Sequence, residues 1–215
     1  MKQDHTEIVC IIDQSGSMSS IKMDAIGGYN EFIESQKKLP GTAQVTTVLF
    51  SSALNIPTFA SNGMKMGYGT TDPRVVRCSG VPIADAVKLN EENYTPNGQT
   101  ALLDSIGLTI DEVGVRLSKM NEADRPGKVL FCIITDGGEN SSREYTSARI
   151  KEMIELQRGT YSWEFIYIGA NQDSFLVSGS LGMSAAFTTN FVASAAGVRS
   201  AYKSMDFMAT SYRSN

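Results

Sequence analysis

The chain has 215 residues, of which 41% are hydrophobic and 20% charged, with only 6 prolines. This composition is typical of a globular protein with an apolar core, and the length fits one large domain. The net charge of -4 argues against a nucleic-acid-binding protein, which usually presents a basic face. We therefore predict a single domain over residues 1–215, with a core at about 7–189 and a helical extension over 190–215.

The chain lacks the sequence features of a membrane or secreted protein. No apolar run approaches the ~18 residues that a membrane-spanning helix needs. The first residues, 1–7, are polar and mixed in charge, without the apolar centre and small-residue cleavage site of a signal peptide. We expect a cytoplasmic protein without membrane contact. Cys10, Cys78 and Cys132 are odd in number and far apart, which predicts no disulfide framework, and Cys10 and Cys132 are expected to be buried.

The first half of the chain begins as an alternation of strand and helix. Residues 8–12 are apolar and predict a buried strand, and a helix follows over 21–39 because apolar side chains recur every three or four positions. Strands are expected at 44–50 and 54–59, the second one antiparallel at an edge because the connection is short. Turn signals over 61–98 predict a long excursion with at most a small hairpin and short strand-like pieces, for example at 74–78.

The second half continues the alternation up to a C-terminal helix, whose Met205, Phe207 and Met208 are expected to lie in the core. The predicted elements are a helix at 100–120, a central strand at 129–135, a helix at 145–157, a strand at 163–168, a short helix at 172–181, a strand at 185–189 and a helix at 191–212. This order predicts an α/β fold that is Rossmann-like and doubly wound. Its central sheet is mostly parallel with one antiparallel edge strand, and helices cover both faces.

Oxygen-bearing side chains follow two of the buried strands. Asp13, Ser15 and Ser17 come directly after the first strand, and Asp136 follows the strand at 129–135. Thr100 begins a helix after a Gly-Gln turn. In a doubly wound sheet the carboxyl ends of strands meet at the point where the strand order switches, and ligands bind there. We expect these five side chains to converge at that edge.

The residue types at this edge indicate which ion it would hold. Three hydroxyls and two carboxylates are hard oxygen donors, which suit magnesium, manganese or calcium rather than zinc or copper. Short side chains fit a small octahedral cage, so Mg²⁺ is the first choice, with Mn²⁺ or Ca²⁺ able to substitute. Hydroxyl ligands add no charge, so the ion would attract an Asp or Glu from a protein partner. Gly16, Gly137 and Gly138 leave room for such an approach.

These motifs resemble the von Willebrand factor type A family, above all its small stand-alone bacterial and phage-encoded members. The resemblance rests on Asp13-x-Ser15-x-Ser17, Gly98-Gln99-Thr100 and Thr135-Asp136-Gly137. It implies a metal-ion-dependent adhesion site (MIDAS) in which Ser15, Ser17 and Thr100 bind the ion directly, and Asp13 and Asp136 bind it directly or through water. It also implies protein binding, in bacteria often with a partner ATPase of the AAA+ class.

Rival functions find less support in the residues. A phosphatase of the haloacid dehalogenase type needs a second acid where Ser15 stands, and a Ser-His-Asp hydrolase would have to recruit His5, the single histidine. No phosphate-binding loop or dinucleotide fingerprint occurs. We predict no enzymatic activity. The alternatives that stay open are a phage virion or assembly component that uses the fold structurally, and a metal-dependent hydrolase.

The segment 60–80 looks like added length between the edge strand and the Thr100 loop. It contains Met64, Met66 and Tyr68. Two interpretations are open, a rim that contacts a partner and a surface loop without a role.

Overall fold

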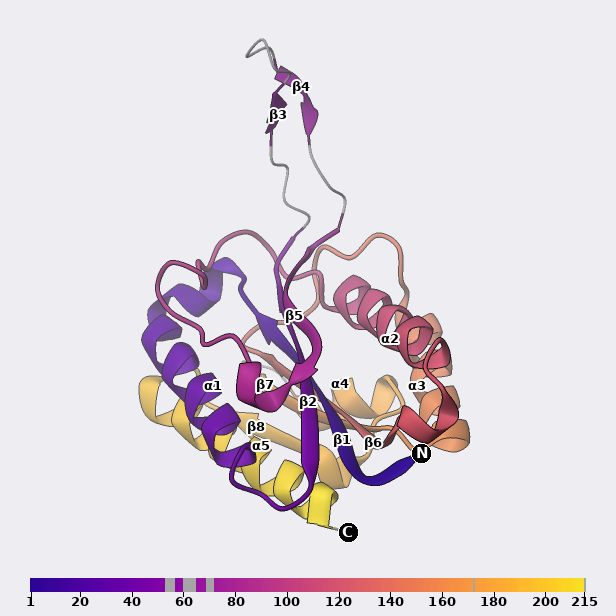
Figure 1. Cartoon of the computed structure of the whole chain (residues 1–215). Coiled ribbons are helices and arrows are strands. Elements are labelled where there is room, and N and C mark those ends of the chain that lie inside the picture. Colours follow the sequence, from indigo (N-terminus) through magenta and orange to yellow (C-terminus); the bar gives the residue numbers. More distant parts are fainter. Residues whose placement is uncertain (53–56, 60–64, 69–71, 172, 215) are drawn as a thin grey trace.

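The computed structural model describes residues 1–52, 72–171 and 173–214, together with the backbone of 57–59 and 65–68. A six-stranded sheet has the order β5-β2-β1-β6-β7-β8 (Figure 1). All neighbouring strands are parallel except β2 and β5. The strands are β1 (Lys2–Asp13), β2 (Thr42–Phe50), β5 (Arg74–Pro82), β6 (Pro126–Thr135), β7 (Glu164–Ala170) and β8 (Thr188–Phe191).

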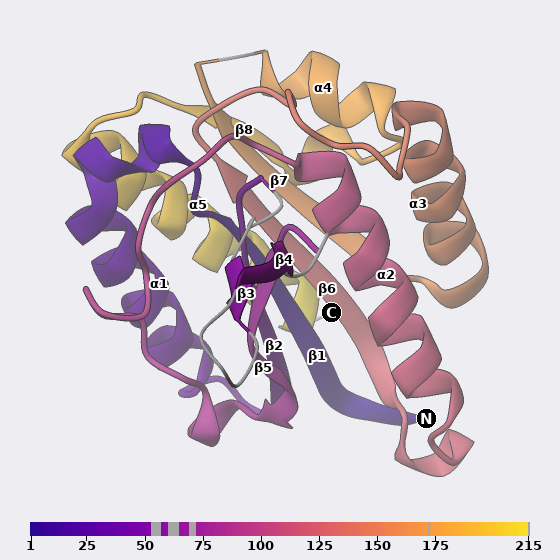
Figure 2. The same cartoon turned by 90° about the horizontal axis from the view of Figure 1, so that it is seen from above.

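Helices cover both faces of the sheet, as predicted. The α-helices are α1 (Lys22–Gln36), α2 (Leu102–Ser118), α3 (Ser147–Tyr161), α4 (Ser174–Ser180) and α5 (Ala195–Ser214). Short 3-10 helices lie at η1 (Gly16–Ile21), η2 (Ile83–Asp85), η3 (Glu122–Asp124) and η4 (Ala185–Phe187). Figures 1 and 2 show α1 and α5 on one face and α2 and α3 on the other. Within the described part of the chain, no helix combines the length and apolarity that crossing a bilayer requires.

The apolar run of β1 supplies both halves of the core. Ile8, Cys10 and Ile12 belong to the cluster under α1 and α5, whereas Val9 and Ile11 belong to the cluster under α2 and α3. Successive side chains of a strand point to opposite faces, so a strand covered on both sides must be apolar throughout. Cys132 on β6 lies opposite Cys10 in register, and both thiols are buried as predicted.

The antiparallel edge strand exists but is a different segment from the one predicted. The edge is β5, in which Val75 and Val81 pack against the core, and not residues 54–59. Of the predicted strand, residues 54–56 lie outside the described residues. Its remainder forms β3 (Pro57–Phe59), which pairs with β4 (Lys65–Tyr68) as a separate two-stranded sheet. A short connection permits a hairpin but does not require one, and here the longer apolar segment pairs with β2.

The last elements are shifted from their predicted bounds. Residues 185–187 form η4, and the final strand β8 begins only at Thr188 and includes Phe191. Helix α5 then packs on α1, with Tyr202 and Met205 buried. Phe207, which was predicted to be in the core, is 76% exposed, so that prediction was wrong. It lies two residues after Met205, about 200° around the helix, and therefore on the opposite side.

Candidate metal site

The strand order places the two candidate aspartates beside each other. Strands β1 and β6 are neighbours, with Ile12 opposite Ile134. Asp13 ends β1, and Asp136 directly follows β6. From β1 the chain continues to β2 on one side, whereas β6 and β7 lie on the other. This is the switch in strand order that the sequence predicted, and both side chains are buried there.

Hydrogen bonds join the first three candidate ligands to Asp136. The backbone N–H of Ser15 donates to Asp13 Oδ1 at 2.6 Å. The Ser15 and Ser17 hydroxyl oxygens lie 3.1 Å apart. The Ser17 hydroxyl donates to Asp136 Oδ1 at 2.6 Å. The loop after β1 is therefore in direct contact with the loop after β6.

Thr100 reaches the same place from the start of α2. A Cβ built on Gly137 would lie 3.6 Å from Thr100 Oγ1 and 3.9 Å from Ser17 Oγ, so both hydroxyls border the space in front of this glycine. The structure thus brings together all five predicted residues, which come from three distant segments. Their role as metal ligands stays a prediction.

The two carboxylates carry negative charge that the described side chains do not balance. Burial raises the pKa of Asp13 to about 6, and the nearby Asp136 adds to this effect. Burial also raises the pKa of Asp136. Among the ion pairs of the described residues, none includes either aspartate. A buried carboxylate without a positive partner is costly, so this pair fits a bound cation.

The composition of the site limits the kind of cation it fits. Within the described residues, no three His, Cys, Asp or Glu side chains form a group that could hold a metal ion. The candidate set has only two carboxylates and relies on hydroxyl oxygens, as a hard cation allows. Ser17 and Gly138 are exposed to solvent, whereas Asp13, Ser15 and Thr100 are buried. The site is therefore open on one side.

Four residues to which the sequence assigned no role hold the aspartates and Thr100 in place. Thr135 donates its hydroxyl to Asp13 Oδ2 at 2.6 Å, and the Tyr94 hydroxyl donates to the Asp13 carbonyl at 2.6 Å. The Asn171 amide donates to the Asp136 carbonyl at 2.9 Å. Asn140 accepts the Thr100 N–H at 2.9 Å. Of these four, only Asn171 could have been suspected from the sequence. An Asn directly after a strand favours a left-handed backbone conformation, which Asn171 has here (φ 56°).

The loop that carries Thr100 is also hydrogen-bonded to the segments directly after β1 and β2, to the latter through the Ala101 N–H and the Ser51 carbonyl at 3.3 Å. Asn97 N–H donates to the Gln14 carbonyl at 2.9 Å, and Gly16 N–H donates to the Gly98 carbonyl at 3.0 Å. Gly98 has φ +72°, and a Cβ there would lie 2.5 Å from Ser52 Oγ, so this turn requires glycine.

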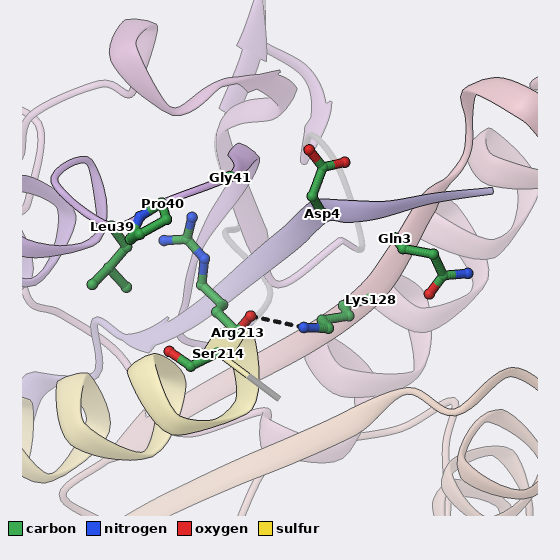
Figure 3. Close-up of a pocket in the computed structure, with 8 residues that line it drawn as sticks. All are labelled: Gln3, Asp4, Leu39, Pro40, Gly41, Lys128, Arg213 and Ser214. Atoms are coloured by element: carbon green, nitrogen blue, oxygen red, sulfur yellow. Dashed lines mark hydrogen bonds between the residues drawn. The ribbon is translucent and has the colours of Figure 1, made fainter.

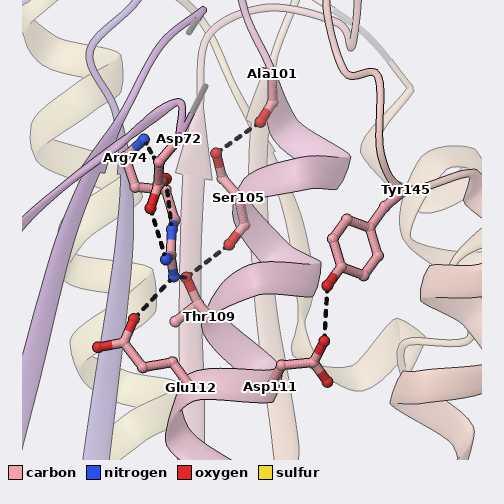
Figure 4. A network of polar contacts seen from close by, with 8 residues as sticks. All are labelled: Asp72, Arg74, Ala101, Ser105, Thr109, Asp111, Glu112 and Tyr145. Atoms are coloured by element: carbon pink, nitrogen blue, oxygen red, sulfur yellow. Dashed lines mark hydrogen bonds and ion pairs between the residues drawn. The ribbon is translucent and has the colours of Figure 1, made fainter. Parts of the chain in front are cut away.

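A chain of polar contacts runs from the edge strand to the residue after Thr100 (Figure 4). Arg74 on β5 donates to Thr109 at 3.2 Å and pairs with Glu112 at 3.1 Å. The Thr109 hydroxyl donates to the Ser105 carbonyl at 2.6 Å, and the Ser105 hydroxyl donates to the Ala101 carbonyl at 2.7 Å. These contacts hold the first turns of α2 on β5.

Asp104, in the first turn of α2, also binds the loop after β6. Its carboxylate accepts the backbone N–H groups of Arg143, Glu144 and Tyr145 at 2.7, 2.9 and 2.8 Å. The loop after Asp136 is therefore anchored on the amino end of α2, where the helix dipole also favours a carboxylate.

A cavity of about 430 Å³ lies at the end of β1 opposite to Asp13 and Asp136 (Figure 3). Lys128 in its wall donates to the Arg213 carbonyl at 2.7 Å, and Arg213 donates to the Gln36 carbonyl at 2.7 Å. Both cations thus satisfy carbonyl groups at the C-terminal ends of α5 and α1, where the helix dipole is negative. Lys128 and Arg213 therefore have a structural role at the ends of these two helices.

His5 is too far from the serines to complete a hydrolytic triad with them. It pairs in register with Thr42 at the start of β2, whereas Asp13 pairs with Phe50 at its end. At ~3.3 Å per residue, the intervening strand is roughly 26 Å long. The His5 ring contacts the Thr42 and Gln44 side chains instead.

Comparison with known proteins places the fold. No family model and no curated protein matches the sequence. Proximal thread matrix protein 1 from the mussel byssus, solved with a zinc-occupied MIDAS motif, matches 98% of this chain and 47% of its own at 16% identity and a TM-score of 0.61. The manganese-loaded TRAP protein of Plasmodium vivax matches 89% of this chain and 70% of its own at 16% identity and a TM-score of 0.56.

A von Willebrand factor type A structure from Catenulispora acidiphila matches 95% of this chain and 42% of its own at 16% identity and a TM-score of 0.55. The chain spans less than half the length of the mussel and Catenulispora chains. At these identities the likeness shows the fold alone. The chain has the Rossmann-like fold of von Willebrand factor type A domains, as its sequence resemblance predicted.

Proposed function

We propose that this chain is a metal-dependent protein-binding module that does not act as an enzyme. In this proposal Mg²⁺ is held by Asp13, Ser15, Ser17, Thr100 and Asp136, and an Asp or Glu of a partner completes its coordination. The observation that carries it is the pair of buried aspartates beside three hydroxyls, without a described positive side chain to pair with either carboxylate. A divalent cation would compensate both charges.

The donor set supports a hard cation and a carboxylate partner. Hydroxyl oxygens leave the positive charge of the ion undiminished, and Mg²⁺ accepts such oxygens in an octahedral shell. The exposed side of the site, at Ser17 and Gly138, gives a partner side chain a route to the ion. Structurally similar proteins include one with a zinc-occupied MIDAS motif and one loaded with manganese, which supports a divalent cation here. An ATPase of the AAA+ class as the partner stays a prediction.

Titration calorimetry of the metal-stripped protein with MgCl₂ and MnCl₂ tests the metal site. Saturable binding is expected for the wild-type chain and for Ser19→Ala, an exposed serine of the same 3-10 turn. It is expected to be lost in Ser17→Ala combined with Thr100→Ala. If the wild-type chain binds neither ion, the proposal is wrong.

The partner chemistry needs a second experiment. Random peptides displayed on phage are selected on the immobilised chain in Mg²⁺ and, separately, in EDTA. Peptides that bind only in Mg²⁺ should share an Asp or Glu, and its replacement by Asn or Gln should abolish their binding. Metal-dependent peptides without a shared acidic residue would refute the acidic-ligand part of the proposal and leave the metal site standing.

A further inference from the structure

One residue, Asn140, holds both backbone polar groups of Thr100. Its side-chain Oδ1 accepts the Thr100 N–H at 2.9 Å, and its backbone N–H donates to the Thr100 carbonyl at 3.1 Å. The two residues are 40 positions apart in the sequence. Asn140 comes from the loop after Asp136, so this contact joins the segments that carry two of the five candidate ligands.

The loop of Asn140 is itself fixed on the helix that Thr100 precedes. Glu139 accepts the Leu103 N–H at 2.9 Å and the Ser142 hydroxyl at 2.7 Å. Asp104 accepts three consecutive N–H groups of the same loop, from Arg143 onwards. Residues 139–145 and the start of α2 therefore form one hydrogen-bonded unit, in which Asn140 contacts Thr100 itself.

We propose that Asn140 is a positioning residue for the divalent cation, a role that rests on the proposed function. It fixes the Thr100 hydroxyl relative to Asp136 and Gly137 without contacting the ion. Metal affinity depends on how well the ligands are preorganised, and residues that orient ligands typically change affinity by about 10–100-fold when they are removed. Replacing Asn140 by Ala removes the acceptor of the Thr100 N–H and keeps the backbone contact, while every candidate ligand side chain stays in the chain.

The chain offers a closely matched control in Asn30 on α1. The Asn30 amide donates to the Leu89 carbonyl at 2.9 Å, and its Oδ1 accepts the Leu89 N–H at 2.9 Å. The Asn30 side chain thus makes two hydrogen bonds to one distant backbone position, where the Asn140 side chain makes one, but Asn30 contacts none of the five candidate ligands. A general loss of stability from removing such a side chain is therefore at least as large in Asn30→Ala.

The test compares Asn140→Ala, Asn140→Asp and Asn30→Ala with the wild-type chain. Mg²⁺ affinity is measured by calorimetry, and the thermal midpoint is measured in EDTA. We expect Asn140→Ala to weaken Mg²⁺ binding about tenfold or more. Asn30→Ala should keep the wild-type affinity at an equal or larger cost in thermal midpoint. Asn140→Asp keeps an oxygen for the Thr100 N–H and should retain most of the affinity.

A second measurement tests the hydrogen bond between the Thr100 N–H and Asn140 Oδ1 in the absence of metal. Hydrogen exchange of the Thr100 amide in EDTA should accelerate in Asn140→Ala and not in Asn30→Ala. Wild-type Mg²⁺ affinity in Asn140→Ala would overturn the role of Asn140 and leave the proposed function intact. Absence of Mg²⁺ binding in the wild-type chain would overturn both.

Discussion

The Ser17 hydroxyl donates a 2.6 Å hydrogen bond to Oδ1 of Asp136, across 119 positions of sequence. A hydroxyl has one proton to donate and two lone pairs to offer. Because Ser17 donates its proton to Asp136, the Ser15 hydroxyl must be the donor in the 3.1 Å contact between the two serines, and one lone pair of Ser17 remains for another partner. The same contact therefore orients the Ser17 hydroxyl oxygen and joins the loops after β1 and β6.

Asp13→Asn should stabilise the metal-free protein at neutral pH while it removes metal binding. Burial raises the pKa of Asp13 from 3.8 to about 6. The folded state holds this proton more tightly than the unfolded state, so the contribution of Asp13 to stability declines as the pH rises from about 4 to about 6. Above that range the penalty is constant, on the order of 3 kcal/mol.

Chemical denaturation of wild type and Asp13→Asn in EDTA at pH 4 and pH 7 measures this effect. The variant should gain more over the wild type at pH 7 than at pH 4. An equal difference at both values would show that the folded state does not perturb the Asp13 carboxyl.

Gly137→Ala should weaken Mg²⁺ binding, because the new methyl group would enter the space bordered by Thr100 Oγ1 and Ser17 Oγ, at 3.6 and 3.9 Å. These are ordinary van der Waals distances, so the effect is expected on the ion and not on the stability of the fold. Gly138→Ala is the matched control, since a Cβ there meets nothing within 4 Å. Calorimetric titration of both variants gives the comparison, and equal affinities would place the ion away from Gly137.

Arg116→Met should destabilise the fold without changing metal affinity per folded molecule. Arg116 donates to the fully buried Glu7 at 2.6 Å, and Thr46 donates to the same carboxylate at 2.7 Å. Removing the arginine leaves the buried Glu7 carboxylate with hydrogen bonds from Thr46 and Gln44 but without its positive partner, at a cost of roughly 3–5 kcal/mol. The exposed pair of Arg149 and Glu152 is the control, and Arg149→Met should change stability by less than about 1 kcal/mol.

Urea denaturation of these variants should also show that Glu7→Gln restores much of the stability lost in Arg116→Met, because it neutralises the stranded carboxylate. If the double variant is no more stable than Arg116→Met, then lost packing of the arginine, and not the buried charge, explains the effect.

Gly28→Ala should loosen α5 from α1. A Cβ at Gly28 would overlap the buried Tyr202 ring, with Tyr202 Cγ at 2.7 Å. The adjacent Gly27 has nothing within 4 Å of the same position, so Gly27→Ala should be neutral or stabilising by up to about 1 kcal/mol. Thermal denaturation of the two variants measures the difference. Equal midpoints would mean that α5 contributes little to the fold, as expected of a dispensable extension.

Sequence patterns predicted the parts of this fold that depend on local periodicity. The apolar runs at 8–12 and 129–135 mark strands covered on both faces, and the oxygen-bearing residues directly after them lie at the switch in strand order. The edge strand was misplaced, because pairing with β2 depends on long-range packing of Val75 and Val81 rather than on the shortness of a connection.

The supports of the site were not predictable for a related reason. Asn140 acts on a residue 40 positions away, and no periodicity or neighbouring motif marks it. Thr135 and Tyr94 likewise contact Asp13 only after the strands and loops have assembled. Local sequence specifies which side chains can bind an ion, whereas tertiary contacts decide how firmly they are held.

Phe50 stands at a shared rung of the sheet, opposite Asp13 on β1 and opposite Arg74 on β5. The chain therefore leaves the sheet after Phe50 and re-enters it at Arg74, in the same row of paired residues as Asp13 of the candidate site. Any length of polypeptide inserted between these two points would leave the strand register unchanged. In the proposed function, the ion would then be bound by one part of the chain and its surroundings set by another, so that exchanging this one segment would change the partner and not the metal site.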